Sequence, residues 1–245
     1  MHIYAIADLH LPFGCPEKDM TLFGPAWDHY TDKIETNWKK EITEEDFVLL
    51  GGDLSWASKL DQSLPDFDWI HKLPGQKIII RGNHDYWWST KSKMQAKLPS
   101  SIYPISKDAF NYKNFSVAGT RLWDSENYHF DPIIIFQKNA PRPKKQALEK
   151  QREIYSKEVE RLKLSLSKMD KNTETKIVLT HYPTISYDLS TSDFFQLFEE
   201  YRIDFSIFGH LHSVKKDTPL FGKKNHTTYL LTSCDFLNFK PIKII

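Results

Sequence analysis

Five short runs of apolar residues recur along the chain, and each is followed at once by polar side chains. The runs are IYAIA before Asp8, FVLL before Gly51, KIII before Arg81, KIVL before Thr180 and FSIF before Gly209. Four or five consecutive residues rich in Ile, Val and Leu are typical of strands covered on both faces of a sheet. If these strands are parallel, their polar clusters lie at one edge, where open α/β sheets bind ligands.

The segments between the runs predict strand–helix–strand units, and hence parallel pairing. In SLPDFDWIHKLPG, after the FVLL run, Ser63 is expected to cap a helix, Pro65 suits its first turn, and a Pro-Gly pair stops it. A similar unit, capped by Ser192, is expected before the FSIF run.

The pattern changes after Trp88. SIYPI, FNYKN and FSVAG are short and separated by polar turns, which predicts antiparallel strands of a second sheet, and TTYLLTS is expected to join it. Residues 143–170 carry the longest helical pattern, because apolar side chains recur on one face from Leu148 to Met169. Residues 124–145 contain three prolines and are predicted to be a loop.

Composition narrows the possible classes of protein. The 245 residues include 33 basic and 32 acidic side chains, and this balance makes nucleic acid an unlikely partner. The two cysteines have neither metal-ligand spacing nor the density of a disulfide scaffold, which favours a reducing compartment. No apolar run has the length of a membrane span and no signal peptide is visible, so we expect a cytoplasmic protein without a membrane partner.

Seven side chains that can bind metal follow the five strands. They are Asp8, His10, Asp53, Asn83, His181, His210 and His212. The pair Asp8 and His10 has a spacing of two, which places both side chains on one side of an extended segment, and His210 and His212 repeat it. Carboxylate, amide and imidazole ligands without a thiolate suit manganese, iron or zinc.

Seven ligands are too many for one tetrahedral ion and suit two ions that share a carboxylate. Two ions roughly 3.5–4 Å apart can clamp the attacking and leaving oxygens of a displacement at phosphorus. A water bound there is acidified enough to be hydroxide near neutral pH. Taken singly, each histidine could instead be a surface or core residue, and Asp53 could be a helix cap.

The order of the polar motifs resembles that of the calcineurin-like metallophosphoesterase superfamily. The motifs are DLH at 8–10, GGD at 51–53, GNHD at 82–85, TH at 180–181 and GHLH at 209–212. The resemblance implies an α/β fold in which two mixed β-sheets pack as a sandwich with flanking helices. We expect a single domain of residues 1–245 with a helical and loop insertion around residues 124–176.

The resemblance also implies roles for individual residues. Asp8, His10 and His212 are predicted to bind one divalent ion, Asn83, His181 and His210 a second, and Asp53 both. His84 matches a histidine that is not a ligand but contacts the substrate phosphate and assists the leaving group. Arg81 matches an arginine that phosphatases use on phosphate, so Arg81 and Asn83 are predicted to bind substrate, although Arg81 could equally pair with an acid.

One departure from the family pattern concerns the position three residues after Asp53. Protein serine/threonine phosphatases of the superfamily carry an acid there that orients the phosphate-facing histidine, whereas this chain has Trp56. This counts against a protein phosphatase and leaves the partner of His84 unidentified. Five weaker pocket candidates are Tyr86, Trp87, Trp88, Arg121 and Trp123.

The sequence therefore predicts an enzyme, a metal-dependent hydrolase of phosphate esters with a small phosphorylated substrate. The alternatives are a nuclease or nucleotide pyrophosphatase of the same fold, a dinuclear hydrolase of amides or carboxylic esters, and a non-catalytic metal-binding scaffold. The sequence does not indicate the natural substrate, whether it is a monoester or diester, the native metals, the oligomeric state or a protein partner. Residues 124–176 are where we expect specificity to lie.

Overall fold

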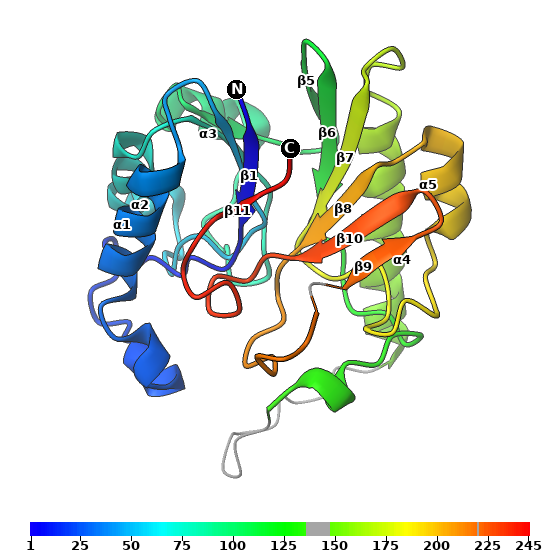
Figure 1. Ribbon diagram of the computed structural model, residues 1–245. Helices are drawn as coiled ribbons and strands as arrows, with labels where there is room; N and C mark the ends of the chain where they lie inside the picture. Colours follow the sequence, from blue (N-terminus) through cyan, green and yellow to red (C-terminus); the bar gives the residue numbers. More distant parts are fainter. Residues whose placement is uncertain (136–147, 220) are drawn as a thin grey trace.

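Two β-sheets face each other, and helices cover their outer faces (Figure 1). The computed structural model describes residues 1–135, 148–219 and 221–245. The first sheet has the strand order β11-β1-β2-β3-β4. Its strands are β1 (Ile3–Ile6), β2 (Phe47–Leu50), β3 (Gln76–Ile79), β4 (Ile102–Pro104) and β11 (Ile242–Lys243).

The second sheet has the order β5-β6-β7-β8-β10-β9. Its strands are β5 (Ala109–Tyr112), β6 (Phe115–Thr120), β7 (Thr175–Thr180), β8 (Phe205–Phe208), β9 (Gly222–Lys224) and β10 (Thr227–Leu231). In each sheet the inner strands are parallel, and antiparallel strands lie at edges, β11 in the first and β5 and β9 in the second. The α/β sandwich of two mixed sheets is therefore confirmed.

The five motif-bearing strands are parallel but divided between the sheets. β1, β2 and β3 belong to the first sheet, and β7 and β8 to the second. One expectation is wrong and one holds in part: SIYPI forms β4 beside β3 in the first sheet, whereas FSVAG forms β6 in the second sheet, antiparallel to β5 as predicted but parallel to β7. The reason is the same for both, because a helix precedes β4 and another precedes β7, and a helical crossover returns the chain in parallel.

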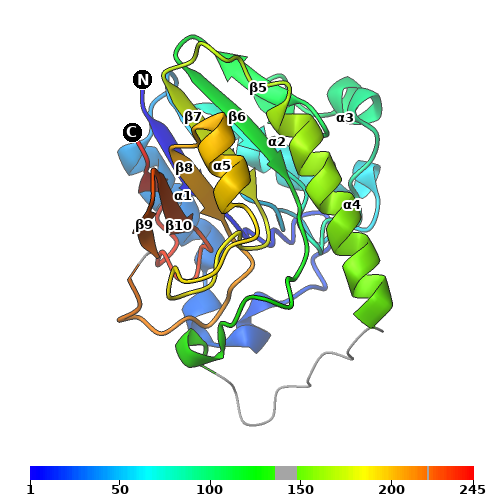
Figure 2. The ribbon, with the colours of Figure 1, turned by 90° about the vertical axis from the view of Figure 1, so that its right-hand side faces the viewer.

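Helices lie on the outer face of the first sheet and, toward the viewer in Figure 2, on that of the second. They are α1 (Tyr30–Glu41), α2 (Leu60–Lys72) and α3 (Lys91–Lys97), then α4 (Leu148–Leu166) and α5 (Phe195–Tyr201). Three short 3₁₀ helices are η1 (Met20–Phe23), η2 (Pro25–Trp27) and η3 (Asp131–Ile133). None of the described helices is both long and apolar enough to cross a membrane.

Two helix starts differ from the sequence prediction. α2 begins at Leu60, so the Ser63 hydroxyl donates to the Leu60 carbonyl at 2.8 Å and Pro65 lies within the helix. Ser192 does not cap α5 directly, because that helix begins at Phe195, and its hydroxyl instead accepts the amide of Phe194 at 3.0 Å. Ser63 thus stabilises the first turn of α2, and Ser192 stabilises the segment just before α5.

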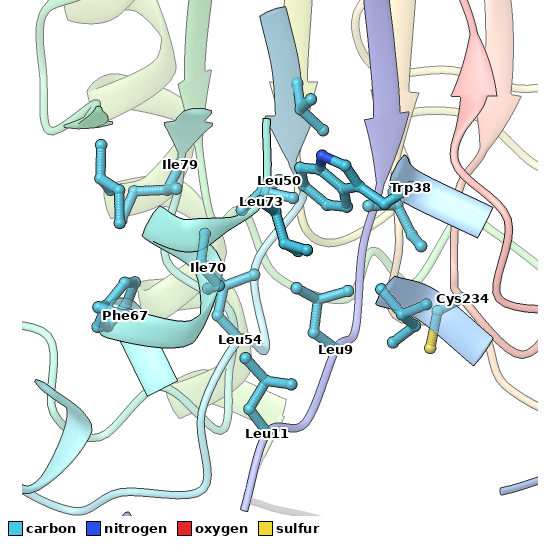
Figure 3. Packing of buried hydrophobic residues seen from close by; sticks show 14 of the residues in the cluster. Leu9, Leu11, Trp38, Leu50, Leu54, Phe67, Ile70, Leu73, Ile79 and Cys234 are labelled. Atoms are coloured by element: carbon cyan, nitrogen blue, oxygen red, sulfur yellow. The ribbon is translucent and has the colours of Figure 1, made fainter. Parts of the chain in front are cut away.

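Apolar side chains fill three layers. The inner faces of the two sheets enclose one layer, which includes Ile3, Leu49 and Ile207. A second layer lies between the first sheet and its helices, where Trp38 and Phe67 are buried (Figure 3). The third lies between the second sheet and α4 and α5. Because the central strands are covered on both faces, they read as continuous apolar runs.

The predicted insertion contains the crossover from β6 to β7. Residues 136–147 lie outside the described residues, and α4 follows them and packs against β6. Leu162 and Leu166 are buried as the apolar pattern predicts, whereas Leu148 is 59% exposed. The Ser165 hydroxyl accepts the amide of Gly119 at 2.9 Å, which ties the helix to the strand.

The two sheets are joined where their strands end. The amide of Ala7, after β1, donates to the carbonyl of Thr232, after β10, at 2.7 Å. The carbonyl of Ala7 accepts the amide of Cys234 at 3.0 Å. This link holds the loops that follow strands of both sheets side by side.

Candidate metal centre

The seven predicted ligands meet where strands of both sheets end. Asp8 and His10 follow β1, Asp53 follows β2, Asn83 follows β3, His181 follows β7, and His210 and His212 follow β8. The structure thus brings together residues that are separated by up to about 200 positions in the chain. The parallel strands of each sheet make this possible, because their carboxyl ends share one edge.

The first cluster consists of Asp8, His10 and His212. Their ligand atoms all lie within 4.8 Å of one another. Nε2 of His10 is 3.3 Å from Nε2 of His212, and the latter is 3.6 Å from Oδ1 of Asp8. These are the three residues predicted to share one ion.

The second cluster surrounds Asn83. Its Oδ1 is 2.7 Å from Nε2 of His181 and 3.1 Å from Nδ1 of His210. Asp53 lies between the clusters, since its Oδ2 is 3.4 Å from Nε2 of His181 and 3.9 Å from Nε2 of His10. Asp8, Asp53 and His181 form a further group of ligand atoms within 4.8 Å of one another.

Hydrogen bonds fix which ring nitrogen of two histidines faces the centre. Nδ1 of His181 lies 2.9 Å from the carbonyl of Gly51, which can only accept, so that nitrogen carries a proton. Nδ1 of His212 lies 2.9 Å from the Asp235 carboxylate in the same way. In the neutral rings, both Nε2 lone pairs then point at other acceptors, and this arrangement fits divalent cations between them.

The pKa values of the histidines agree with this arrangement. Burial lowers the pKa of His10 to about 3, so that imidazole is neutral and able to bind metal. Burial alone would also lower the pKa of His181, but the carboxylates of Asp53 and Asp8 raise it to about 9. Asp235 likewise outweighs burial and raises the pKa of His212 to about 9. The extra protons on His181 and His212 therefore supply the positive charge that a bound cation would otherwise provide.

The backbone at the ligands is strained. Four of the seven predicted ligands have left-handed φ angles, 60° at Asp8, 45° at His10, 53° at Asp53 and 71° at His210. Such angles cost residues other than glycine on the order of 1–3 kcal/mol each and cluster at functional sites. The strand ends turn sharply at these residues, which directs their side chains into the centre.

Asp85 holds two of the ligand loops together, a role that the sequence analysis missed. Its buried carboxylate accepts the amides of Asp53 at 2.8 Å, Leu54 at 2.9 Å and Gly82 at 2.7 Å, and Nε1 of Trp87 at 2.8 Å. The loops after β2 and β3 are thereby fixed to each other. The one sign of this role in the sequence is the presence of a carboxylate at the end of the GNHD motif.

Gly82 is required by the same close approach. A Cβ atom at this position would lie 2.1 Å from Oδ1 and 2.2 Å from the amide nitrogen of Asp53. Any side chain here would therefore displace the residue predicted to bridge the two ions.

His84 lies beside the centre, and its amide donates to Oδ1 of Asp53 at 2.7 Å. The ring centroid is 5.8 Å from that of His10 and 5.1 Å from that of Trp56. Trp56, at the position where protein phosphatases carry an acid, also stacks on His10 at 4.8 Å. An aromatic side chain thus packs against the two imidazoles in place of a carboxylate.

Two further residues near the ligands have no recognisable sequence motif. Asp235 lies 23 positions beyond His212 and binds its ring, as described above. Asp124 has an oxygen 3.9 Å from Nε2 of His210. Arg81, in contrast, does not join the ligand clusters but lines a neighbouring pocket with Arg121 and Arg161.

Comparison with known proteins agrees with the geometry. The sequence pattern described as calcineurin-like phosphoesterase matches residues 1–214. A curated relative, the gene 66 protein of Mycobacterium phage D29, is 30% identical over 84 residues, which are 34% of this chain. The match spans 40% of the phage protein's own length.

Solved structures share the fold at low sequence identity. A phosphopantetheinyl hydrolase of Mycobacterium tuberculosis has a TM-score of 0.53 and 11% identity, over 100% of this chain and 95% of that one. A protein of unknown function from Aquifex aeolicus has a TM-score of 0.50 and 16% identity, over 99% and 95%. GAP50, the anchor in the inner membrane complex of Plasmodium, has a TM-score of 0.50 and 13% identity, over 96% and 72%.

Proposed function

Because the chain belongs to the calcineurin-like phosphoesterase family, we propose that it hydrolyses small phosphate esters with two divalent metal ions. The observation that carries this proposal is the convergence of two carboxylates, an amide and four imidazoles at one sheet edge, with lone pairs facing one another. Manganese, iron and zinc suit these ligands. We retain the cytoplasm as the proposed location.

The side chains divide into two sets of ligands. Asp8, His10 and His212 would hold one ion, and Asn83, His181 and His210 the other. Asp53 would bind both, because it lies between the two sets. When bound, the ions would acidify a water and offset the negative charge of the phosphate.

His84 would act on the leaving group. Its backbone is fixed by the hydrogen bond to Asp53, and its ring lies next to that of His10, one of the ligands. Burial lowers the pKa of the His84 imidazole, while the Asp53 carboxylate raises it. A phosphate anion beside the ring would favour the protonated form, which can donate to the departing alkoxide.

Two alternatives are weaker. A nuclease would need a basic surface to bind the polymer, and the chain carries a formal net charge of only +1. A non-catalytic scaffold is an alternative because GAP50, of the same fold, is described as an anchor. However, a scaffold has no need of the complete ligand set or of His84, both of which this chain retains.

The test is hydrolysis of p-nitrophenyl phosphate and bis-p-nitrophenyl phosphate by metal-stripped protein, before and after addition of manganese. We expect turnover only with metal, near-complete loss in Asp53→Ala, and a loss of about 10²–10⁴-fold in kcat in His84→Ala. His71→Ala, which removes an exposed histidine of α2, serves as the matched control and should keep full activity.

Metal content completes the experiment. About two ions per chain are expected in the active protein and fewer in Asp53→Ala. A protein that binds two ions but hydrolyses neither ester in these assays would contradict small-ester hydrolysis. A protein that binds no metal would contradict the metal centre itself.

A further inference from the structure

A pocket beside the metal centre has more cationic than anionic side chains in its wall. It occupies about 490 Å³ between the segment that precedes α3 and the middle of α4. The charged side chains of its wall are Arg81, Lys107, Arg121, Arg161 and Glu158. Ser89, Thr90 and Ser106 add hydroxyl groups, which can donate hydrogen bonds. We call it the cationic pocket.

Glu158 holds two of the cations in place but leaves an excess of positive charge. Its buried carboxylate accepts the Thr120 hydroxyl at 2.6 Å, Arg121 at 3.1 Å and Arg161 at 2.5 Å. The guanidinium of Arg121 also lies 4.7 Å from the centre of the Trp123 ring. One carboxylate therefore orients two guanidinium groups, while the wall carries four cations in all.

Arg81 forms no ion pair with any described residue, although the carboxylates of Asp85 and Glu158 lie near enough to stabilise its charge. No described carboxylate forms an ion pair with it, and residues 136–147 and 220 contain no Asp or Glu. Its Nε is buried without a hydrogen-bond partner in the described structure, as is the Nε of Arg121. Arg121 has an ion-pair partner in Glu158, whereas a half-buried guanidinium without one, as at Arg81, is costly, and a bound anion would satisfy it.

The pocket and the metal centre share the same strand ends. Arg81 immediately precedes Gly82, whose backbone packs against Asp53. The carbonyl of Arg121 accepts the amides of the ligand His181 at 3.2 Å and of Tyr182 at 3.0 Å. Arg81 of the cationic pocket is two residues before Asn83, and two residues span at most about 7 Å. One small substrate can therefore reach both.

We propose that the cationic pocket binds a second phosphate group of the substrate whose phosphate ester is cleaved at the metal centre. This inference rests on the proposed function and narrows it to substrates that carry two phosphate groups. Arg81 then recognises the remote phosphate, and the metal ligands hold the one that reacts. Arg121 and Arg161 supply forked donors that match phosphate, and Lys107 adds a fourth charge.

The first experiment compares matched esters in manganese-loaded protein, namely hexanediol bisphosphate with hexyl phosphate, and the butyl and octyl analogues. We expect kcat/KM to be at least about tenfold higher for the bisphosphate of best-fitting length, mainly through KM. Lys107→Gln and Arg161→Gln should each reduce this preference about tenfold. Lys157→Gln, which removes an exposed cation from α4 outside the pocket, should keep it.

The second experiment does not depend on hydrolysis. Calorimetry measures the binding of pyrophosphate to metal-stripped protein, and we expect binding that Lys107→Gln and Arg161→Gln weaken and Lys157→Gln does not. Equal kcat/KM for all matched pairs, or a preference that both pocket variants retain, would overturn the inference. Hydrolysis of no ester, with pocket-dependent pyrophosphate binding, would support the phosphate site and contradict the proposed function.

Discussion

At the scale of single residues, hydrogen-bond partners decide how two of the predicted ligands face the centre. His181 and His212 present Nε2 because Gly51 and Asp235 accept from their Nδ1. Such outer partners set the tautomer and ring orientation of histidine ligands. We therefore expect Gly51 and Asp235 to influence metal affinity without binding the ion themselves.

Replacement of Asp235 by Asn tests this role. The Asp235→Asn side chain would still fit but loses the charge that favours the donor at Nδ1 of His212, so we expect a 10–100-fold loss of manganese affinity. Competition with a chelator of known affinity measures it. Asp204→Asn is the matched control, because Asp204 pairs with His226 on the surface at 2.8 Å. Equal affinities of Asp235→Asn and the unsubstituted protein would contradict the role.

The sequence could predict the ligands but not these partners. The ligand residues stand in five short motifs whose order resembles a known family, and each motif directly follows an apolar run. Asp235 follows β10 in the segment SCDFLNF, where neither spacing nor neighbours mark it out. Its role depends on β10 lying beside β8, and this pairing is a property of the folded sheet.

At the scale of elements, the loops after β2 and β3 act as one unit because Asp85 joins them. Its Oδ2 accepts two amides, of Asp53 and Gly82, and its Oδ1 accepts those of Leu54 and Ser55 and the Trp87 ring nitrogen. Burial raises the pKa of this carboxyl to about 6, and the amides oppose the shift.

Asp85→Asn is expected to loosen both loops. In either orientation of the amide, its NH₂ group would face backbone N–H donors, which leaves at least two of them unsatisfied in the interior. We expect a loss of about 1–3 kcal/mol in the free energy of unfolding, together with weaker metal binding. Urea denaturation measures the first and metal content the second. Asp68→Asn on the exposed face of α2 is the control, and equal losses in both variants would rule out the joining role.

Sequence periodicity identified most of the elements but not the sheet to which each belongs. The parallel arrangement of the motif-bearing strands follows from apolar runs separated by helical patterns. β4 was predicted in the second sheet, because short strands between polar turns look alike whichever sheet they join. α3, only seven residues long, is the crossover that returns the chain to the first sheet.

At the scale of the whole molecule, the centre joins the two sheets. The predicted ligands come from loops after β1, β2 and β3 on one side and β7 and β8 on the other. In metal-free protein, these acidic and imidazole groups can balance their charges only through protons. We therefore expect metal binding, protonation and stability to be linked in this fold.

The linkage predicts how the stability of the metal-free protein depends on pH. The folded protein raises the pKa of His181 and His212 to about 9, above the value of about 6.5 in an unfolded chain. The stabilisation from these two imidazoles is thus fully present below about pH 6.5 and is lost as the pH rises through about 9. The fully buried His181 contributes on the order of 3 kcal/mol, and His212 contributes less because about a third of its side chain (34%) is exposed.

Urea denaturation of metal-stripped protein between about pH 6.5 and 9.5 tests this prediction. The free energy of unfolding should fall across this range, and His212→Gln should show a smaller fall, while His226→Gln, at a surface His–Asp pair, should not. Manganese should reverse the trend, because the ions displace the same protons and bind more tightly as the pH rises. A metal-free protein whose stability stays level or increases over this range would show that protons do not balance the charges of the centre.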